Sequence, residues 1–160
     1  MPMKTQDSLL RFSKSREDLL KVIAGLEEME FEAPHVEGVW TIKDLIGHIT
    51  AWEIALLDLL RSFIAGEPFT PEHIPDHDIW NADQAMKRRN ASVQKILQES
   101  IAVRQQLLEL ANALSDEQWG QVLPAPWGSQ ETLVQMIDGL AWHEEEHTRN
   151  ILKYFNSLRG

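Results

Sequence analysis

His143 and His147 are the residues of this 160-residue chain whose types and spacing point most directly to chemistry. Four positions separate them, which on a helix places both side chains on one face with Cβ atoms about 5 to 6 Å apart. One metal ion can therefore bind both imidazoles. Their helical neighbours Leu140 and Ile151 are apolar, so each imidazole needs a partner to offset its desolvation. That partner is either a metal ion or a polar side chain of another helix.

A third histidine, His48, favours the metal ion. It lies in a second apolar-periodic segment, between Leu45 and Trp52. Three imidazole nitrogens leave coordination positions open, as in catalytic sites, whereas structural zinc sites have four protein ligands. Imidazole suits Zn, Ni, Fe or Cu better than Mg or Ca, and we predict Zn or Ni on His48, His143 and His147. Affinity should fall below about pH 6, because the ligating imidazoles must be neutral. We expect solvent positions for the other three histidines, His35, His73 and His77.

The run from His143 to His147 also matches the H-E-x-x-H pattern of metalloproteases, in which the glutamate is the general base. Glu144 occupies that position. A protease of this kind needs a third ligand further along the chain, and residues 148–160 contain no His, Asp or Glu. We therefore disfavour a protease. Glu144 is expected to support the ligands or to face solvent, with a general-base role as the alternative.

Apolar residues recur at helical spacing along most of the chain, which predicts an all-α protein. The sharpest helix start is Thr41, which should form a capping box with Asp44. Three prolines indicate an extended connection over 66–77, and Ser129 should cap the last helix. We expect four long helices over about 5–28, 41–66, 78–114 and 129–154, a short helical turn at about 115–120, and no sheet.

These helices predict a four-helix bundle that forms a single domain over residues 1–160. We expect an up-down-down-up order, because the connection after the second helix is long enough to cross the bundle lengthwise. The second and fourth helices should then run antiparallel. His48 lies near the start of its helix and His143 and His147 lie closer to the end of theirs, so antiparallel packing brings all three to a similar depth.

Composition sets the remaining expectations. A net charge of −10 opposes binding to phosphate backbones and anionic membranes, and the absence of cysteine removes thiolate ligands and nucleophiles. No apolar run reaches the ~18 residues of a membrane span, and no signal peptide is evident. We expect a cytoplasmic protein with no nucleic-acid or membrane partner. Surplus apolar residues on the second helix predict a homodimer interface there, formed by Leu56, Leu57, Leu60 and Phe63.

Two segments carry a resemblance to a known family. The segment from Trp40 to Glu53, WTIKDLIGHITAWE, resembles the helix-two signature of the DinB-like (DinB/YfiT) metalloenzymes. The segment from Trp142 to Ile151, WHEEEHTRNI, is similar to the fourth-helix signature of the same superfamily. The resemblance implies a histidine triad in a bundle that is commonly dimeric. It also implies a transferase or isomerase activity that uses mycothiol, bacillithiol or glutathione as a thiol cosubstrate.

A further stretch, Trp80 and Asn81 followed by Arg88, Arg89 and Asn90, resembles the ClbS/DfsB branch of four-helix proteins, which includes a resistance hydrolase. Charged clusters usually lie in water, so we favour a solvated helix face here over a substrate clamp. The six tryptophans are expected mainly in the core and at helix ends, namely Trp40, Trp52, Trp80, Trp119, Trp127 and Trp142.

Two functions remain open from the sequence. In the first, a divalent metal activates a thiol or water that attacks a small electrophilic molecule, as in conjugation or hydrolytic detoxification. In the second, the bundle binds a small molecule or a partner helix without chemistry. We favour the enzyme. Trp52 and Asn81 should lie near its substrate pocket. Asp44, one turn before His48, either orients that imidazole or serves only as the partner of Thr41 in the helix cap.

Overall fold

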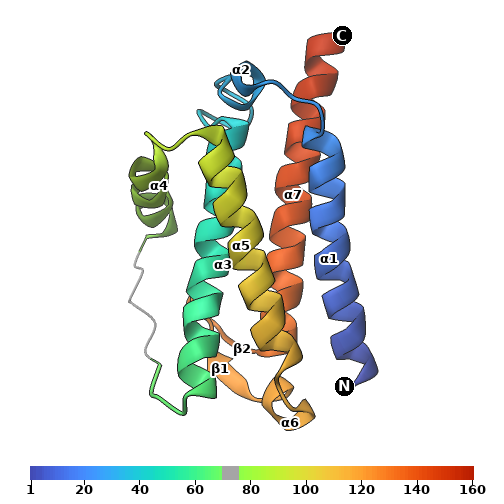
Figure 1. Cartoon of the computed structure of the whole chain (residues 1–160), viewed down its shortest axis with the longest axis vertical. Helices are drawn as coiled ribbons and strands as arrows, with labels where there is room; N and C mark the ends of the chain where they lie inside the picture. Colours follow the sequence, from blue (N-terminus) through green and yellow to red (C-terminus); the bar gives the residue numbers. More distant parts are fainter. Residues whose placement is uncertain (70–75) are drawn as a thin grey trace.

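The computed structural model describes residues 1–69 and 76–160. His73 falls outside these residues. The four long helices are α1 (Met3–Ile23), α3 (Ile42–Ile64), α5 (Val93–Asn112) and α7 (Leu133–Arg159). They form a four-helix bundle, in which α1 and α7 rise side by side while α3 and α5 descend (Figure 1). The predicted up-down-down-up order and the antiparallel arrangement of α3 and α7 are confirmed.

Local capping chemistry sets where α3 and α7 begin. The Thr41 hydroxyl accepts a hydrogen bond from the backbone N–H of Asp44, and the Asp44 carboxylate accepts one from the backbone N–H of Thr41, so the predicted capping box is confirmed. The start of α7 is three residues later than predicted. Thr132, with Gln135 as its capping partner, takes the N-cap position, whereas the carbonyl of Ser129 accepts from the Ala125 N–H in a tight turn.

That turn joins two short strands, β1 (Val122–Pro124) and β2 (Gln130–Thr132), which pair antiparallel with Val122 opposite Thr132. The prediction of no sheet is therefore wrong. Each strand has three residues, too few for an alternating pattern to be visible. The turn closes on Gly128, which has a φ of +105° that side-chain-bearing residues rarely adopt.

The third predicted helix is divided into α4 (His77–Arg88) and α5. Ser92 makes the division, because its hydroxyl accepts a hydrogen bond from the backbone N–H of Lys95 and caps α5. The ammonium of Lys43 donates to the carbonyls of Arg89 and Ala91 between the two helices. As a result α4 lies beside α3, outside the bundle (Figure 1).

Two further short helices cover the ends of the bundle. The first long helix ends earlier than predicted, and α2 (Glu28–Phe31) follows it as a separate turn. The predicted turn near residue 115 is α6 (Asp116–Trp119), capped by Ser115 and Gln118. Among the described residues, no helix is both long enough and apolar enough to cross a bilayer.

The core contains the α3 residues that were predicted to form a dimer interface. Leu56, Leu57 and Leu60 are at most 3% exposed and pack inside the bundle, and Phe63 packs against the same cluster. The sequence had indicated that these residues are surplus and form a dimer interface. That prediction is wrong, because they are used in the core of the bundle. A helix packed on several sides buries more than one stripe of apolar residues, which residue counting along the sequence underestimates.

Candidate metal centre

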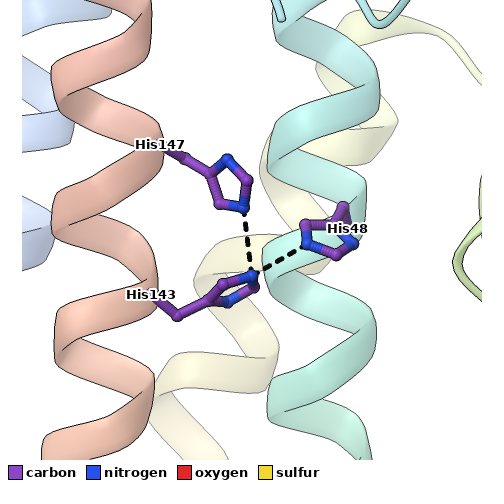
Figure 2. A group of neighbouring side chains, drawn as sticks. All are labelled: His48, His143 and His147. Carbon is purple, nitrogen blue, oxygen red and sulfur yellow. Dashed lines mark hydrogen bonds between the residues drawn. The ribbon is translucent and has the colours of Figure 1, made fainter. Parts of the chain in front are cut away.

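The antiparallel helices α3 and α7 bring His48, His143 and His147 together. The Nε2 atom of His143 lies 2.8 Å from Nε2 of His48 and 3.0 Å from Nε2 of His147. One potential ligand nitrogen from each imidazole falls within 4.8 Å of the others, and the three rings point toward one another across the gap between the helices (Figure 2). His48 and His147 are only 7% and 9% exposed.

Glu37 sets the protonation pattern of the cluster. Its carboxylate lies 2.7 Å from Nδ1 of His147, and because a carboxylate only accepts, the Nδ1–H donates. With that proton on Nδ1, the Nε2 atom of His147 faces Nε2 of His143 as a potential ligand nitrogen. Glu37 was not among the predicted site residues. It lies in the loop before α3, where Gly38 with a φ of +62° turns the chain. Nothing in the local sequence links residue 37 to residue 147.

Burial keeps two of the histidines neutral. Burial lowers the pKa of His48 to about 2, with a further contribution from the other two imidazoles. Burial, together with His147, lowers the pKa of His143 to about 4. Both rings are thus uncharged near pH 7, the form in which imidazole binds metals.

The donor set fits a divalent metal ion. The Nε2 atom of His143 faces two other Nε2 atoms, and a neutral imidazole nitrogen cannot donate to one neighbour and accept from another. Glu37 holds the proton of His147 on Nδ1, so that Nε2 of this ring carries a lone pair. A cation can accept lone pairs from all three Nε2 atoms, whereas a single proton cannot bridge them all. The Glu37–His147 pair also has the form of the carboxylate–histidine–metal arrangements that orient ligands.

Asp44 does not orient His48. Its carboxylate is engaged by the backbone N–H of Thr41, and within the described part of the chain Nδ1 of His48 has no hydrogen-bond partner. Instead the indole of Trp40 packs edge-on against the ring, with centroids 4.8 Å apart. The capping role of Asp44 therefore explains its position, and His48 is held by packing.

Glu144 lies outside the cluster. It is fully buried rather than facing solvent, so that part of the expectation was wrong. Its carboxylate accepts hydrogen bonds from Ser15, from Arg16 at 2.7 Å and from Arg104 at 3.0 Å. Burial alone would raise the pKa of Glu144. Arg104 and Arg16 outweigh burial, so the pKa of this carboxyl is lowered. One position after His143, the side chain is rotated about 100° around α7, which turns it away from the metal centre.

Those arginines also bind Glu53, so each of the four long helices contributes one charge to a buried cluster. Arg16 of α1 lies 3.0 Å from Glu53 of α3, and Arg104 of α5 pairs with the same carboxylate. The guanidinium of Arg104 also stacks on Phe12, 3.6 Å from the ring centroid. Two positive and two negative groups satisfy one another, which is the condition for burying charge.

A cavity of about 380 Å³ opens on two of the clustered histidines, His48 and His143. Trp52 and Asn81 line it as expected and are joined by a hydrogen bond of 3.0 Å from the indole Nε1–H to the amide oxygen. Three residues expected elsewhere line it too: His77, predicted in solvent, and Trp127 and Trp142, predicted in the core or at helix ends. Sequence periodicity could not indicate this grouping, because α4 and the β1–β2 turn supply residues from outside the bundle.

The basic pair after Asn81 does not form a solvated face. Arg88 is largely buried, donates to Glu99 at 2.6 Å and lies against Gly47 of α3, so it fastens α4 to the bundle. Arg89 is exposed. The expected solvated cluster is therefore wrong for Arg88, whose charge is neutralised by Glu99 across the division between α4 and α5.

Fold and site together define a four-helix-bundle protein with a candidate three-histidine metal centre. The model of the DinB superfamily matches residues 11–151 of the chain, which therefore belongs to this superfamily. Among its relatives is a protein of Oceanobacillus iheyensis named as a candidate metal-dependent hydrolase, 23% identical over 132 residues, covering 82% of this chain and 73% of the relative.

Solved structures confirm the fold. YfiT from Bacillus subtilis, described as having an unusual four-helix bundle topology, aligns with a TM-score of 0.73 at 14% identity over 99% of this chain and 90% of its own. The colibactin self-resistance protein ClbS, solved in complex with a dsDNA, gives 0.80 at 16% identity over 96% of both chains. A mycothiol-dependent maleylpyruvate isomerase gives 0.79 at 14% identity over 94% of this chain and 61% of its own.

These similarities confirm the resemblance to both the DinB/YfiT proteins and ClbS. The dsDNA in the ClbS complex shows that a protein of this fold can bind nucleic acid, which weakens the prediction that this chain has no such partner. The net charge of −10 still opposes binding to a phosphate backbone.

Proposed function

We propose that this chain is a divalent-metal-dependent enzyme acting on a small electrophilic molecule, with Zn or Ni held by His48, His143 and His147. The observation that carries the proposal is the convergence of one potential ligand nitrogen from each of three imidazoles, all within 4.8 Å of one another, with His48 and His143 at the wall of a cavity. When bound, such an ion acts as a Lewis acid that lowers the pKa of a water or thiol entering the site.

The surrounding residues prepare the site for this role. Glu37 holds the His147 ring by its Nδ1–H, and Trp40 holds His48 by packing. Burial keeps His48 and His143 neutral. Three protein ligands leave room for a substrate or cosubstrate group, as in catalytic sites. The cavity beside His48 and His143 is lined by the indole of Trp52 and offers room for such a group.

Two reaction classes fit the site, hydrolysis and transfer to a low-molecular-weight thiol such as mycothiol, bacillithiol or glutathione. The first is supported by the name of the Oceanobacillus relative, and the second by the mycothiol dependence of the maleylpyruvate isomerase of similar fold. In hydrolysis, water bonds to an electrophilic carbon, the bond from that carbon to the leaving group breaks, and the leaving group takes up a proton from the water. In thiol transfer to a conjugated electrophile, the thiol sulfur bonds to one carbon of the double bond as its π bond breaks, and the thiol proton goes to the other carbon. Glu144 is not proposed as the base for either proton transfer, because Arg16 and Arg104 hold its carboxylate.

A non-catalytic binding protein is the alternative, and one observation favours it. The three histidines lie within hydrogen-bonding distance of one another, so the cluster can persist as a polar contact between α3 and α7. The cavity would then bind a small molecule without chemistry.

Metal titration of the chelator-treated protein tests the proposal. We expect one Zn or Ni per chain by calorimetry and elemental analysis, and the loss of this uptake in His48→Ala, His143→Ala and His147→Ala. Glu17→Gln is the control, because Glu17 is an exposed residue of α1 outside the cluster. Absence of stoichiometric uptake in the parent protein would reject the metal centre.

Activity is tested separately. Metal-loaded protein is incubated with a panel of electrophiles, with each thiol or with water alone. Turnover that exceeds that of the triple-alanine variant identifies the reaction class. If none of the pairings does so while small molecules still raise the melting temperature, the binding alternative is correct.

We also propose a homodimer, through a different surface from the one the sequence suggested. Leu20 and Ile101 are 46% and 60% exposed and border an apolar groove of about 450 Å³ between α1 and α5. Covering these residues with a second copy would remove apolar area from water. Sedimentation equilibrium should show a dimer for the parent chain and a shift to monomer for Ile101→Glu. A monomeric parent at micromolar concentration would reject this assembly.

A further inference from the structure

The cavity beside the histidines is walled mainly by aromatic side chains. Trp52 of α3, Trp127 of the β1–β2 turn and Trp142 of α7 line it together with Leu140. Its volume of about 380 Å³ is near the lower end of the range for small-molecule sites. A ligand that fills it is therefore small and lies against indole surfaces while it reaches His48 and His143.

Two of these indoles offer the cavity carbon surface rather than a hydrogen-bond donor. The Nε1–H of Trp52 is taken by Asn81, and that of Trp127 by the carboxylate of Glu131. Trp52 is also fixed by its aromatic neighbours, with ring centroids 4.3 Å from Trp80 and 6.3 Å from Trp127. Prepositioned rings of this kind favour stacked or edge-on contact with another ring.

The side chain of Trp142 is unusually exposed to solvent for a large aromatic residue. It is 55% exposed although it precedes His143 and lines the cavity. A large aromatic side chain left in water beside a cavity is typical of a binding surface.

The lining is also uncharged. Among the described residues that line this cavity there is no Asp, Glu, Lys or Arg, and its polar groups apart from the metal-centre histidines are His77 and Asn81. A free carboxylate or phosphate would find no counter-charge there beyond a metal ion. A hydroxyl, carbonyl or nitro group could be bonded by the amide of Asn81 or a ring nitrogen of His77.

We propose that this cavity is an aromatic slot, which binds the flat, uncharged ring system of the substrate against the indoles of Trp52, Trp127 and Trp142 that line it and holds its reactive substituent toward His48 and His143. The substrate class is an uncharged aromatic or conjugated electrophile. The reaction part of this inference rests on the proposed function, whereas binding of the ring does not require the metal.

Gly139 gives a way to close the slot without unfolding the protein. It lies one helical turn before His143 on α7 and lines the cavity. A Cβ atom added there would lie 3.8 Å from Cζ2 of Trp127, an ordinary contact, so Gly139→Ala fits. The longer side chain of Gly139→Leu would occupy the slot, and leucine favours a helix more than glycine does.

Calorimetry with matched probes tests the slot in metal-free and metal-loaded protein. The probes are 2-naphthol, its saturated counterpart decahydro-2-naphthol, and the anion 2-naphthoate. We expect 2-naphthol to bind once per chain. In both forms of the protein it should bind about tenfold more tightly than the saturated alcohol, in keeping with the extra energy of aromatic pairs. In the metal-free form it should also bind about tenfold more tightly than naphthoate, because the described residues of the lining offer no counter-charge. Equal affinity for the saturated alcohol, or for naphthoate in the metal-free form, would overturn the proposal.

The variants locate the probe. Gly139→Leu should weaken 2-naphthol binding at least about tenfold, and Gly139→Ala, the matched control, by much less. If Gly139→Leu loses its helical circular dichroism, Trp142→Ala replaces it, with an expected loss of about fivefold. Unchanged affinity in a folded blocking variant would place the probe elsewhere and overturn the slot. Metal uptake without 2-naphthol binding rejects the slot alone, whereas 2-naphthol binding without metal uptake rejects the proposed function alone.

Discussion

The carboxylate of Glu37 lies 2.7 Å from Nδ1 of His147, although 110 residues separate them in the chain. The contact connects the loop before α3 to the C-terminal half of α7. It fixes which nitrogen of His147 carries the proton and directs the other toward His48 and His143. Carboxylates that hold ligating histidines in this way increase metal affinity.

Glu37→Gln should therefore weaken metal binding about 10- to 100-fold while the fold is kept, because the amide is a weaker acceptor for Nδ1–H. Competition titration with a chromogenic chelator measures the change. Glu17→Gln is the control, since Glu17 is an exposed residue of α1. The metal affinity of this variant should equal that of the parent protein. Parent-like affinity in Glu37→Gln would show that the contact does not support the metal.

Glu144 and Glu145 are adjacent but should respond very differently to replacement. Glu144→Gln removes a buried countercharge from Arg16 and Arg104 and should lower the free energy of unfolding by about 3 to 5 kcal/mol. Glu145→Gln removes only a surface pair with Arg11 and should cost about 0 to 1 kcal/mol. Urea denaturation of both variants measures the difference, and similar losses would contradict the buried cluster.

Acid should destabilise the metal-free protein through its histidines. The pKa of His143 is lowered to about 4 and that of His48 to about 2, whereas an unfolded histidine titrates near about 6.5. Below that pH the unfolded state binds more protons, so this part of the stability is complete above about pH 6.5 and is lost as pH falls, down to about 4 for His143 and about 2 for His48. The loss is about 1.4 kcal/mol per pH unit for each histidine.

Urea titrations of chelated protein at about pH 7, 6 and 5 measure this dependence. His143→Leu should reduce the slope by roughly half, because it removes one of the two groups and relieves the other. His35→Gln should keep the parent slope. A stability that does not change between these pH values would show that His48 and His143 are not held neutral by the fold.

Metal addition should stabilise the folded chain by mass action. Free zinc or nickel at about 100 times its dissociation constant adds about 2.7 kcal/mol, which for a chain of this size raises the melting temperature by roughly 5 to 10 °C. Magnesium at the same concentration should have no effect, because imidazole ligands disfavour it. His147→Ala should abolish the zinc-dependent shift. A shift that persists in this variant would indicate a different binding site.

The sequence by itself predicted the bundle of long helices, apart from the division between α4 and α5, and it singled out the three histidines that the fold brings together. The spacing of His143 and His147 and the capping box at Thr41 involve residues within one helical turn, so they follow from local geometry. The depth of His48 within its helix was enough to predict that α3 and α7 run antiparallel. The position of Glu144 was also accessible, because a residue one step from His143 must point about 100° away from it.

Only the tertiary structure decided what surrounds the histidines. Glu37 reaches His147 because the turn at Gly38 returns the chain to α7, and such a contact has no periodic signature in the sequence. Glu144 can be buried only because arginines on α1 and α5 meet it. The aromatic cavity exists because α4 and the β1–β2 turn dock against α3 and α7. Local spacing fixes which face a side chain occupies, whereas the groups that meet that face depend on long-range packing.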